Sequence, residues 1–236
     1  MLPLKDDVPT RSFPVVTVAL IVANVLVFFL FEVGGTPIEA DIVHYSFYPC
    51  TISGPCVGLA EVRRTGPITG IFTSMFMHAG FLHLAGNMLF LWIFGNNVED
   101  SMGRLRFLVF YLAAGVVSTI GQAILTISQA GPAAASIPNL GASGAISGVV
   151  GAYFLILPLA SILVLFLIII IPVWFRVPAV FFLAGWFLLQ AWQGDFQLEH
   201  PAQGGGVAVF AHIGGFLFGY LAVRLFASRP ALRPLY

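Results

Sequence analysis

Residues Asn139–Gly148 read NLGASGAISG, and the interpretation of the whole chain starts from this stretch. A polar, glycine-bearing segment here turns into an apolar helix that is expected to run to about Leu157. Gly141 and Gly144 flank Ser143, and glycine lets a backbone bend sharply and approach another chain closely. The first N–H groups of a helix have no partner within it, so they can receive a developing oxyanion. We therefore interpret Ser143 as a nucleophile; the alternative is a plain N-cap serine at the start of a helix.

The composition places this serine in a membrane. The chain has 236 residues, of which 59% are hydrophobic and 8% are charged, whereas soluble domains carry about 25% charged residues. The mean hydropathy is +0.98. The chain is therefore expected to be a polytopic protein of the lipid bilayer. Ten basic and ten acidic side chains give zero formal net charge, so nothing indicates a nucleic acid or a strongly charged partner.

The apolar segments predict an all-α membrane protein built as one bundle of six transmembrane helices. The expected spans are Pro14–Val33, Phe81–Phe94 with a further turn at each end, Leu105–Ser128, Ser143–Leu157, Val177–Trp192 and Val207–Ala227. Residues 1–13 are then a short cytoplasmic N-terminus, residues 14–227 the six-helix domain, and residues 228–236 a cytoplasmic C-terminal tail.

Three connecting segments carry expectations of their own. The polar segment from the first span to about Gly70 is too long for a bare connector, so it is expected to fold on the membrane surface or to dip into it. Gly95–Asn97 is expected to close the second span. Pro172 interrupts the apolar run before the fifth span, so Ile162–Phe175 is interpreted as a membrane-associated lead-in.

The basic residues determine the expected orientation. With six spans, eight of them fall on one side of the membrane: Lys5, Arg11, Arg104, Arg106, Arg176, Arg224, Arg229 and Arg233. The other side has Arg63 and Arg64. Both termini of this multi-pass protein of the cell membrane are therefore expected in the cytoplasm, and the starts of spans two, four and six are expected to face outward.

This orientation brings a serine and a histidine to a similar depth. From Ser143 to Leu157 the fourth span covers about 22 Å, against about 30 Å for the hydrocarbon core, so Ser143 is expected below the outer surface. His212 lies about five residues into the sixth span. Serine needs a base, and neutral histidine is a natural one. An ionised third group would be costly in lipid, so the sequence predicts a Ser-His dyad without an acid.

The second span supplies two further candidates. His83 and Asn87 share one helical face, and both can donate hydrogen bonds to an oxyanion. His78, which precedes the helix, is expected to shape the adjoining loop. His78, His83 and His212 offer the alternative of a metal site, but no Cys or carboxylate lies near them in the sequence to complete the ligands. No metal and no cofactor are therefore expected.

Small residues recur at every fourth position of spans four and six. They are Gly144, Gly148 and Ala152 in the former, and Ala211, Gly215 and Gly219 in the latter. Such stripes let helix backbones approach closely, as a serine and a histidine on separate helices require. Ordinary helix packing explains the same spacing and is compatible with this interpretation.

These motifs resemble those of the rhomboid family of intramembrane serine proteases. The matching motifs are His78-x4-His83-x3-Asn87, Gly141-Ala142-Ser143-Gly144 and Ala211-His212-x2-Gly215-x3-Gly219, with Gly95–Asp100 and Gly103 resembling a bacterial subgroup. The resemblance implies a serine endopeptidase in which Ser143 is the nucleophile and His212 the general base. It also implies that His83 and Asn87 are oxyanion partners. The implied reaction hydrolyses peptide bonds in or next to the transmembrane segments of other membrane proteins, with water reaching the site from the outer face.

The chain departs from the family pattern at two places. Many bacterial members carry Trp-Arg where this chain has Thr69–Gly70. Some members stack a tyrosine on the catalytic histidine, and Ser147 occupies that position here. Another aromatic residue, such as Trp186 or Phe187, is therefore expected to orient His212.

Other interpretations remain at this stage. Cys50 and Cys56 lie on the expected outer side, where disulfides persist, and both a bridge and two free thiols stay open. A non-catalytic rhomboid-like protein that binds membrane clients is disfavoured, because the dyad and the oxyanion residues are all present. A transporter is disfavoured because no inverted repeat is visible and no charged residue lies in mid-span. The sequence does not indicate the natural substrate or the oligomeric state.

Overall fold

The computed structural model describes residues 2–33, 38–58, 65–168, 171–199 and 208–232 of the chain. Its elements, in order, are β1 (Leu2–Lys5), α1 (Val15–Val27), the π-helical turn η1 (Phe28–Val33), α2 (Ile38–Tyr45), α3 (Cys50–Ser53), α4 (Pro67–Ser74), α5 (Phe81–Met102), α6 (Arg104–Leu125), the π-helical turn η2 (Thr126–Ala130), α7 (Gly131–Ala135), α8 (Ser143–Ile156), β2 (Ser161–Ile168), β3 (Ile171–Pro178), α9 (Ala179–Glu199) and α10 (Val209–Phe226). Within these ranges, two segments, Arg104–Gln129 and Val209–Phe226, are long and apolar enough to cross a membrane, while Val15–Phe31 and Ser143–Ile156 are shorter apolar helices.

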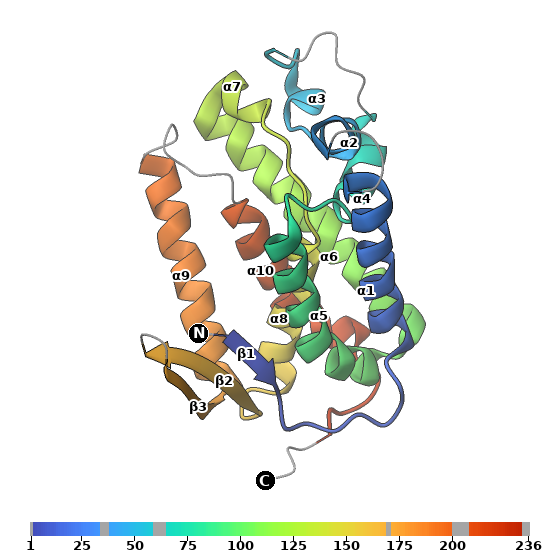
Figure 1. Ribbon diagram of the computed structural model, residues 1–236, viewed down its shortest axis with the longest axis vertical. Helices are drawn as coiled ribbons and strands as arrows, with labels where there is room; N and C mark the ends of the chain where they lie inside the picture. The colour runs from blue at the N-terminus through green and yellow to red at the C-terminus, as the bar shows by residue number, and fades with distance from the viewer. Residues whose placement is uncertain (1, 34–37, 59–64, 169–170, 200–207, 233–236) are drawn as a thin grey trace.

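Helix α8 lies at the centre of the bundle (Figure 1), packed against α5, α6 and α10. Residues 144–153 of α8 are all buried. Its contact with α10 is especially close: a Cβ on Gly215 would collide with the carbonyl oxygen of Gly144, and one on Gly219 with that of Gly148. The close approach that the small-residue stripes predict is therefore confirmed.

Helix α5 is longer than the sequence predicts. Gly95–Asn97 lies inside the helix, which ends instead before Gly103, a glycine with a positive φ of 80°. The last turns of α5 carry polar side chains, and these form hydrogen bonds with residues of other elements. The carboxylate of Glu99 accepts hydrogen bonds from the N–H groups of Val16 and Thr17 in the first turn of α1, where a negative charge also opposes the helix dipole. The predicted end was wrong because these partners lie far away in the sequence.

The N- and C-terminal segments meet at one end of the bundle (Figure 1). Arg11 forms an ion pair of 2.7 Å with Asp100 and donates a hydrogen bond to the carbonyl oxygen of Pro230. Asp6 accepts a hydrogen bond of 2.6 Å from the hydroxyl of Tyr153 at the far end of α8. Burial raises the pKa of the Asp6 carboxyl to about 6. These contacts fasten the N-terminal segment to α5, α8 and the C-terminal segment.

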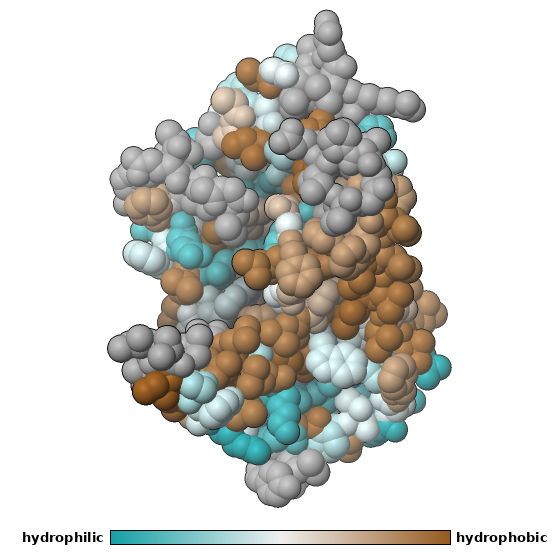
Figure 2. Space-filling view, in the orientation of Figure 1, coloured by the Kyte–Doolittle hydropathy of each residue, from teal (hydrophilic) through white to brown (hydrophobic). Residues whose placement is uncertain are grey.

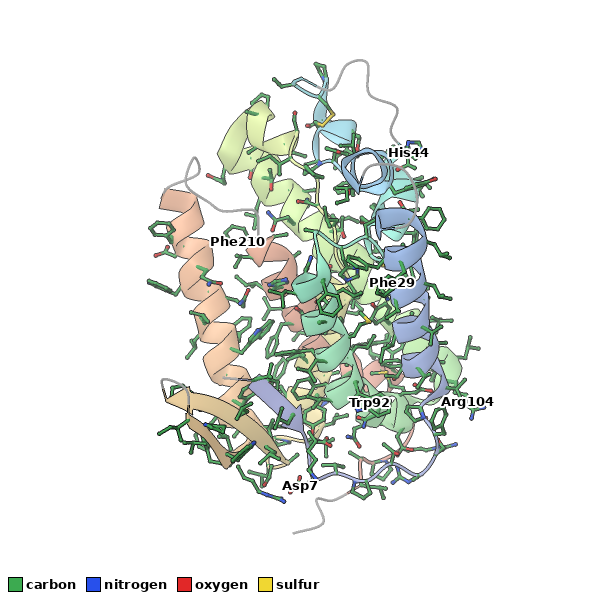
Figure 3. The ribbon with its side chains drawn as sticks, in the orientation of Figure 1. Asp7, Phe29, His44, Trp92, Arg104 and Phe210 are labelled. Atoms are coloured by element: carbon green, nitrogen blue, oxygen red, sulfur yellow. A yellow bond between two sulfur atoms is a disulfide. The ribbon has the colours of Figure 1, made fainter. Side chains whose placement is uncertain are left out.

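Polar side chains gather at the end of the molecule that carries the terminal segments. Figure 3 shows Asp7 and Arg104 at the end that carries the terminal segments and His44 at the opposite end. Figure 2 shows hydrophilic atoms at the same lower end and a broad hydrophobic surface over α1. Together with the composition, this distribution is that of a membrane protein, in which apolar helix faces meet lipid between polar margins.

An antiparallel three-stranded sheet, in the order β1-β2-β3, corrects the prediction of an all-α fold. Strands β2 and β3 occupy the expected lead-in Ile162–Phe175 and pair from Ser161 with Pro178 to Ile168 with Ile171. This run is rich in β-branched and aromatic residues, which fit a pleated surface, and its proline lies on the edge strand β3, where proline is tolerated. Strand β1 adds to the free side of β2.

Two connecting regions complete the comparison. The helix expected as the fifth span is α9, and it runs to Glu199 rather than to Trp192. Part of the expected Gln193–Gly206 loop is therefore helical, and the last residues of that loop lie outside the described part. The connector after α1 folds into α2, α3 and α4, and a disulfide joins Cys50 to Cys56. Residues 63–64, predicted on the outer side, lie outside the described ranges.

Candidate active site

Two helices bring Ser143 and His212 together. Ser143 is the first residue of α8, and His212 lies in the first turn of α10. The Ser143 Oγ lies 2.8 Å from the His212 Nε2, a hydrogen-bond distance. This distance requires the close packing of α8 against α10. The contact between Gly144 and Gly215 lies one residue after Ser143 and three residues after His212. The pair has the geometry in which an imidazole takes the proton of a serine hydroxyl.

The second nitrogen of His212 has a partner that the sequence analysis missed. Its Nδ1 lies 2.7 Å from the side-chain oxygen Oε1 of Gln190, a buried residue of α9. One signal in the sequence pointed to it: Gln190 is a polar amide inside an apolar run, four residues after Trp186, so the two side chains share a helical face.

The aromatic residues expected to orient His212 divide between two places. The ring of Trp186 lies beside the imidazole, with centroids 6.0 Å apart and planes tilted by 36°. Phe187 instead packs against Phe216, at a centroid distance of 4.5 Å. The hydroxyl of Ser147, at the position of the family tyrosine, donates a hydrogen bond of 2.7 Å to the carbonyl oxygen of Ser143.

His83 and Asn87 face the same cavity as Ser143 and His212. The backbone N–H of Ala79 donates to Nδ1 of His83, which leaves Nε2 of the neutral ring as a donor. The side-chain nitrogen Nδ2 of Asn87 is buried and has no hydrogen-bond partner among the described residues. Both helix positions therefore offer donors toward the cavity, as an oxyanion requires.

Gly141 makes room for the His83 ring. Its φ is +117°, a conformation that favours glycine, and a Cβ built there would lie 2.8 Å from the Cε1 of His83. The N–H of Gly141 donates to the carbonyl oxygen of Ser74 at 2.8 Å, so this group is not free to bind an oxyanion. The N–H of Ser143 belongs to the first turn of α8, where helical N–H groups lack intrahelical partners.

His78 is fully buried next to this group. Its ring centroid lies 5.2 Å from that of His83, and its Nδ1 is 3.2 Å from the carbonyl oxygen of Phe76. Both His78 and Phe76 belong to the loop between α4 and α5, whose shape His78 is expected to influence.

The cavity has a volume of about 520 Å³. Its polar groups are those of His83, Asn87, Asn139, Ser143, Ser147 and His212, and its other walls are apolar. Pro138 and Leu140 come from the loop before α8, while Phe90 and Trp186 come from α5 and α9. A largely apolar cavity with a few converging polar groups is the usual form of a site that binds a substrate.

Comparison with known proteins identifies a family. A family model described as a rhomboid domain matches residues 65–229. Rhomboid protease GluP of Bacillus subtilis (strain 168) is 33% identical over 140 residues, which are 59% of this chain and 24% of the relative. The mitochondrial presenilin-associated rhomboid-like protein of Homo sapiens is 30% identical over 205 residues, which are 85% of this chain and 45% of the relative. Mitochondrial Rhomboid protein 1 of Saccharomyces cerevisiae is 36% identical over 93 residues, 39% of this chain and 26% of the relative. The matched regions cover less than half of each of these relatives.

Proposed function

Because this chain belongs to the rhomboid family, we propose that it is an intramembrane serine endopeptidase that cleaves peptide bonds in or next to the transmembrane segments of other membrane proteins. One observation carries the proposal: Ser143 Oγ and His212 Nε2 lie 2.8 Å apart at the wall of a cavity of about 520 Å³. A relative named as a rhomboid protease is consistent with this proposal.

The reaction proceeds in two steps. Ser143 Oγ attacks the carbonyl carbon of the scissile bond, and its proton passes to His212 Nε2. The imidazolium then gives this proton to the departing amine, which leaves an ester on Ser143. A water molecule repeats the sequence: His212 takes its proton, the hydroxide attacks the ester carbonyl, and the proton returns to Ser143 as the acid is released.

Three donors are proposed to stabilise the negative oxygen formed in each step. They are Asn87 Nδ2, His83 Nε2 and the backbone N–H of Ser143. Among the described residues the buried Asn87 Nδ2 has no hydrogen-bond partner, which supports this role, because a buried donor without a partner is costly and is retained where a ligand will use it. In a largely apolar cavity such donors are worth more than in water.

The proposed placement in the membrane follows the sequence. Six spans between residues 14 and 227, with residues 1–13 and 228–236 in the cytoplasm, put the dyad near the outer leaflet. The first turns of α5, α8 and α10 line the cavity, and α5 and α10 run from their starts toward the end that carries the terminal segments (Figure 1). Water is proposed to enter from the outer side.

The test is cleavage in a bilayer. The purified protein is reconstituted in phospholipid vesicles with a panel of single-span membrane proteins, and products are identified by mass spectrometry. We expect cleavage by the wild type and none by Ser143→Ala or His212→Ala, with both variants folded to the same melting temperature. Cleavage that persists in Ser143→Ala contradicts the proposal. Binding of panel members by the folded wild type without cleavage favours the client-binding alternative.

A further inference from the structure

We infer that Gln190 is a positioning residue for the proposed base His212, and this inference rests on the proposed peptidase function. The Oε1 of Gln190 lies 2.7 Å from His212 Nδ1, while Nε2 of the same ring lies 2.8 Å from Ser143 Oγ. Side chains from α9, α10 and α8 thus form one hydrogen-bonded chain. Gln190 is 7% exposed, although α9 stands at the edge of the bundle (Figure 1).

The first consequence concerns the tautomer of the ring. An amide oxygen has no proton to donate, so the contact at Nδ1 requires the proton to be on the histidine nitrogen. In the neutral ring Nε2 then carries the lone pair, and it accepts the hydroxyl proton of Ser143. The opposite tautomer has no acceptor for Ser143 and cannot act as the base. The contact with Gln190 therefore selects the reactive form of His212.

The second consequence concerns ring orientation. Ser147 occupies the place of the family tyrosine and donates to a backbone carbonyl. Trp186 contacts the ring at a tilt of 36°, which restrains its position but offers no hydrogen bond along the ring plane. Gln190 supplies that bond. When His212 becomes an imidazolium, the amide oxygen faces the positive charge without the cost of ionising a carboxylate in lipid.

The test compares three variants by kcat and KM for one substrate in vesicles. Gln190→Met keeps the length of the side chain but cannot accept the Nδ1–H, and we expect kcat to fall roughly 10- to 100-fold with KM nearly unchanged. Gln190→Glu keeps a carbonyl oxygen at the same place, and because burial keeps its carboxyl group protonated and neutral, it should recover most of the rate. Leu189→Met, at an exposed neighbouring position of α9, is the matched control and should behave like the wild type.

A spectroscopic measurement separates positioning from simple packing. In protein labelled with ¹⁵N-histidine and bearing Ser143→Ala, the His212 signal should show a protonated Nδ1, and Gln190→Met should shift that ring toward the Nε2-protonated form. An unchanged tautomer, or a rate loss in Gln190→Met that Gln190→Glu does not recover, overturns the inference. Because this readout needs no turnover, it remains decisive even if the wild type proves to have no peptidase activity.

A different observation points to a second inference, about the β2–β3 hairpin. Strand β3 is exposed along Ile171–Arg176, and its side chains are apolar up to Phe175. Ile171 is 63% exposed and Trp174 58%. The hairpin joins α8 to α9 and projects beside the lower end of α9 (Figure 1). The geometry points to phospholipid at the membrane interface as the partner of this hairpin.

Two opposing free-energy costs determine how deep the hairpin lies in the membrane. In water the hairpin would expose a contiguous apolar surface and an edge strand, a combination that promotes aggregation. In the hydrocarbon core, the edge strand would expose backbone N–H and C=O groups that lipid cannot hydrogen-bond, which is costly. The interface satisfies both, because headgroup water reaches the strand edge while the side chains meet acyl chains. Trp174 is the residue type enriched at this depth, and Arg176 at the base of the hairpin lies toward the polar end.

Spin labels test this placement in phospholipid nanodiscs. A nitroxide on Trp174→Cys is compared with one on Val109→Cys, on an exposed face of α6, and one on Arg229→Cys, in the exposed C-terminal segment. We expect the ratio of relaxation by oxygen to relaxation by a water-soluble nickel chelate at the hairpin label to lie between the ratios at Val109→Cys and Arg229→Cys. A ratio equal to that at Val109→Cys places the hairpin in the hydrocarbon core and overturns the inference. Relaxation that matches Arg229→Cys places the hairpin in water and overturns the inference.

Discussion

Substituting Gly215 by alanine should separate the proposed dyad without touching it. The added Cβ would collide with the carbonyl oxygen of Gly144, the residue that follows Ser143. Non-bonded heavy atoms pack at about 3.5 Å, so α8 and α10 must move apart by roughly 1 Å or more. His212 lies three residues before Gly215, so the Ser143–His212 distance of 2.8 Å should lengthen beyond hydrogen-bond range.

The magnitude follows from geometry and packing. Misplacing reacting groups by about 1 Å costs about 10²-fold in rate, and overpacking a closely fitted core costs about 1–3 kcal/mol in stability. We therefore expect Gly215→Ala to lower kcat by about 10²-fold and to lower the melting temperature by a few degrees. The assay is turnover of a reconstituted substrate, with thermal unfolding measured on the same preparation.

Gly214→Ala is the matched control. It makes the same change one residue earlier in α10, where the nearest atom to the new Cβ is the Cα of Ser118 at 3.8 Å, an ordinary contact. Its turnover should stay near that of the wild type. Equal turnover for Gly215→Ala and Gly214→Ala would refute the claim that close α8–α10 packing builds the site.

Three further predictions concern other parts of the molecule. Asn87→Ala should lower kcat more than it weakens substrate binding, because the unpaired Nδ2 is proposed to act in the transition state; a weaker binding with kcat unchanged would remove that role. The Asp6 carboxyl, whose pKa is raised to about 6 by burial, binds its proton more tightly in the folded than in the unfolded chain. Stability measured by thermal unfolding should therefore fall by up to about 3 kcal/mol as the pH rises from about 4 to above 6, relative to Asp6→Asn, in which this contribution is absent; identical pH profiles would contradict the prediction. Reducing the Cys50–Cys56 disulfide should lower loop stability by about 2 kcal/mol, measured as earlier proteolysis of the loop, whereas a double Cys→Ala variant should not respond to reductant.

The sequence predicted those helices whose ends are marked locally. Helix α8 begins at Ser143 as expected, because a polar, glycine-bearing loop precedes an apolar run, and α10 begins within two residues of its predicted start. Helix α5 was predicted too short because the partner of Glu99 is the first turn of α1, far away in the sequence. The β2–β3 hairpin was missed because the apolar run around Pro172 has no period that separates a strand from a membrane segment.

The residues of the site likewise divide into those that the sequence predicted and one that it did not. Helix spacing and orientation place Ser143, His212, His83 and Asn87 around one cavity, as motifs on three helices suggested. Gln190 carried a weaker signal, since a single amide in an apolar helix indicates a buried partner but not which one. Its contact with His212 depends on how α9 leans against α10, a tertiary feature that sequence periodicity does not determine.

The proposed reaction depends on the activation of Ser143 as a nucleophile by His212. The most direct test is labelling of the folded protein in detergent with a fluorophosphonate probe, followed by peptide mapping of the modified residue. The expected result is a covalent adduct on Ser143 of the wild type, absent in Ser143→Ala and strongly slowed in His212→Ala. A folded wild type that takes no label, or that is labelled at another residue, would contradict the claim.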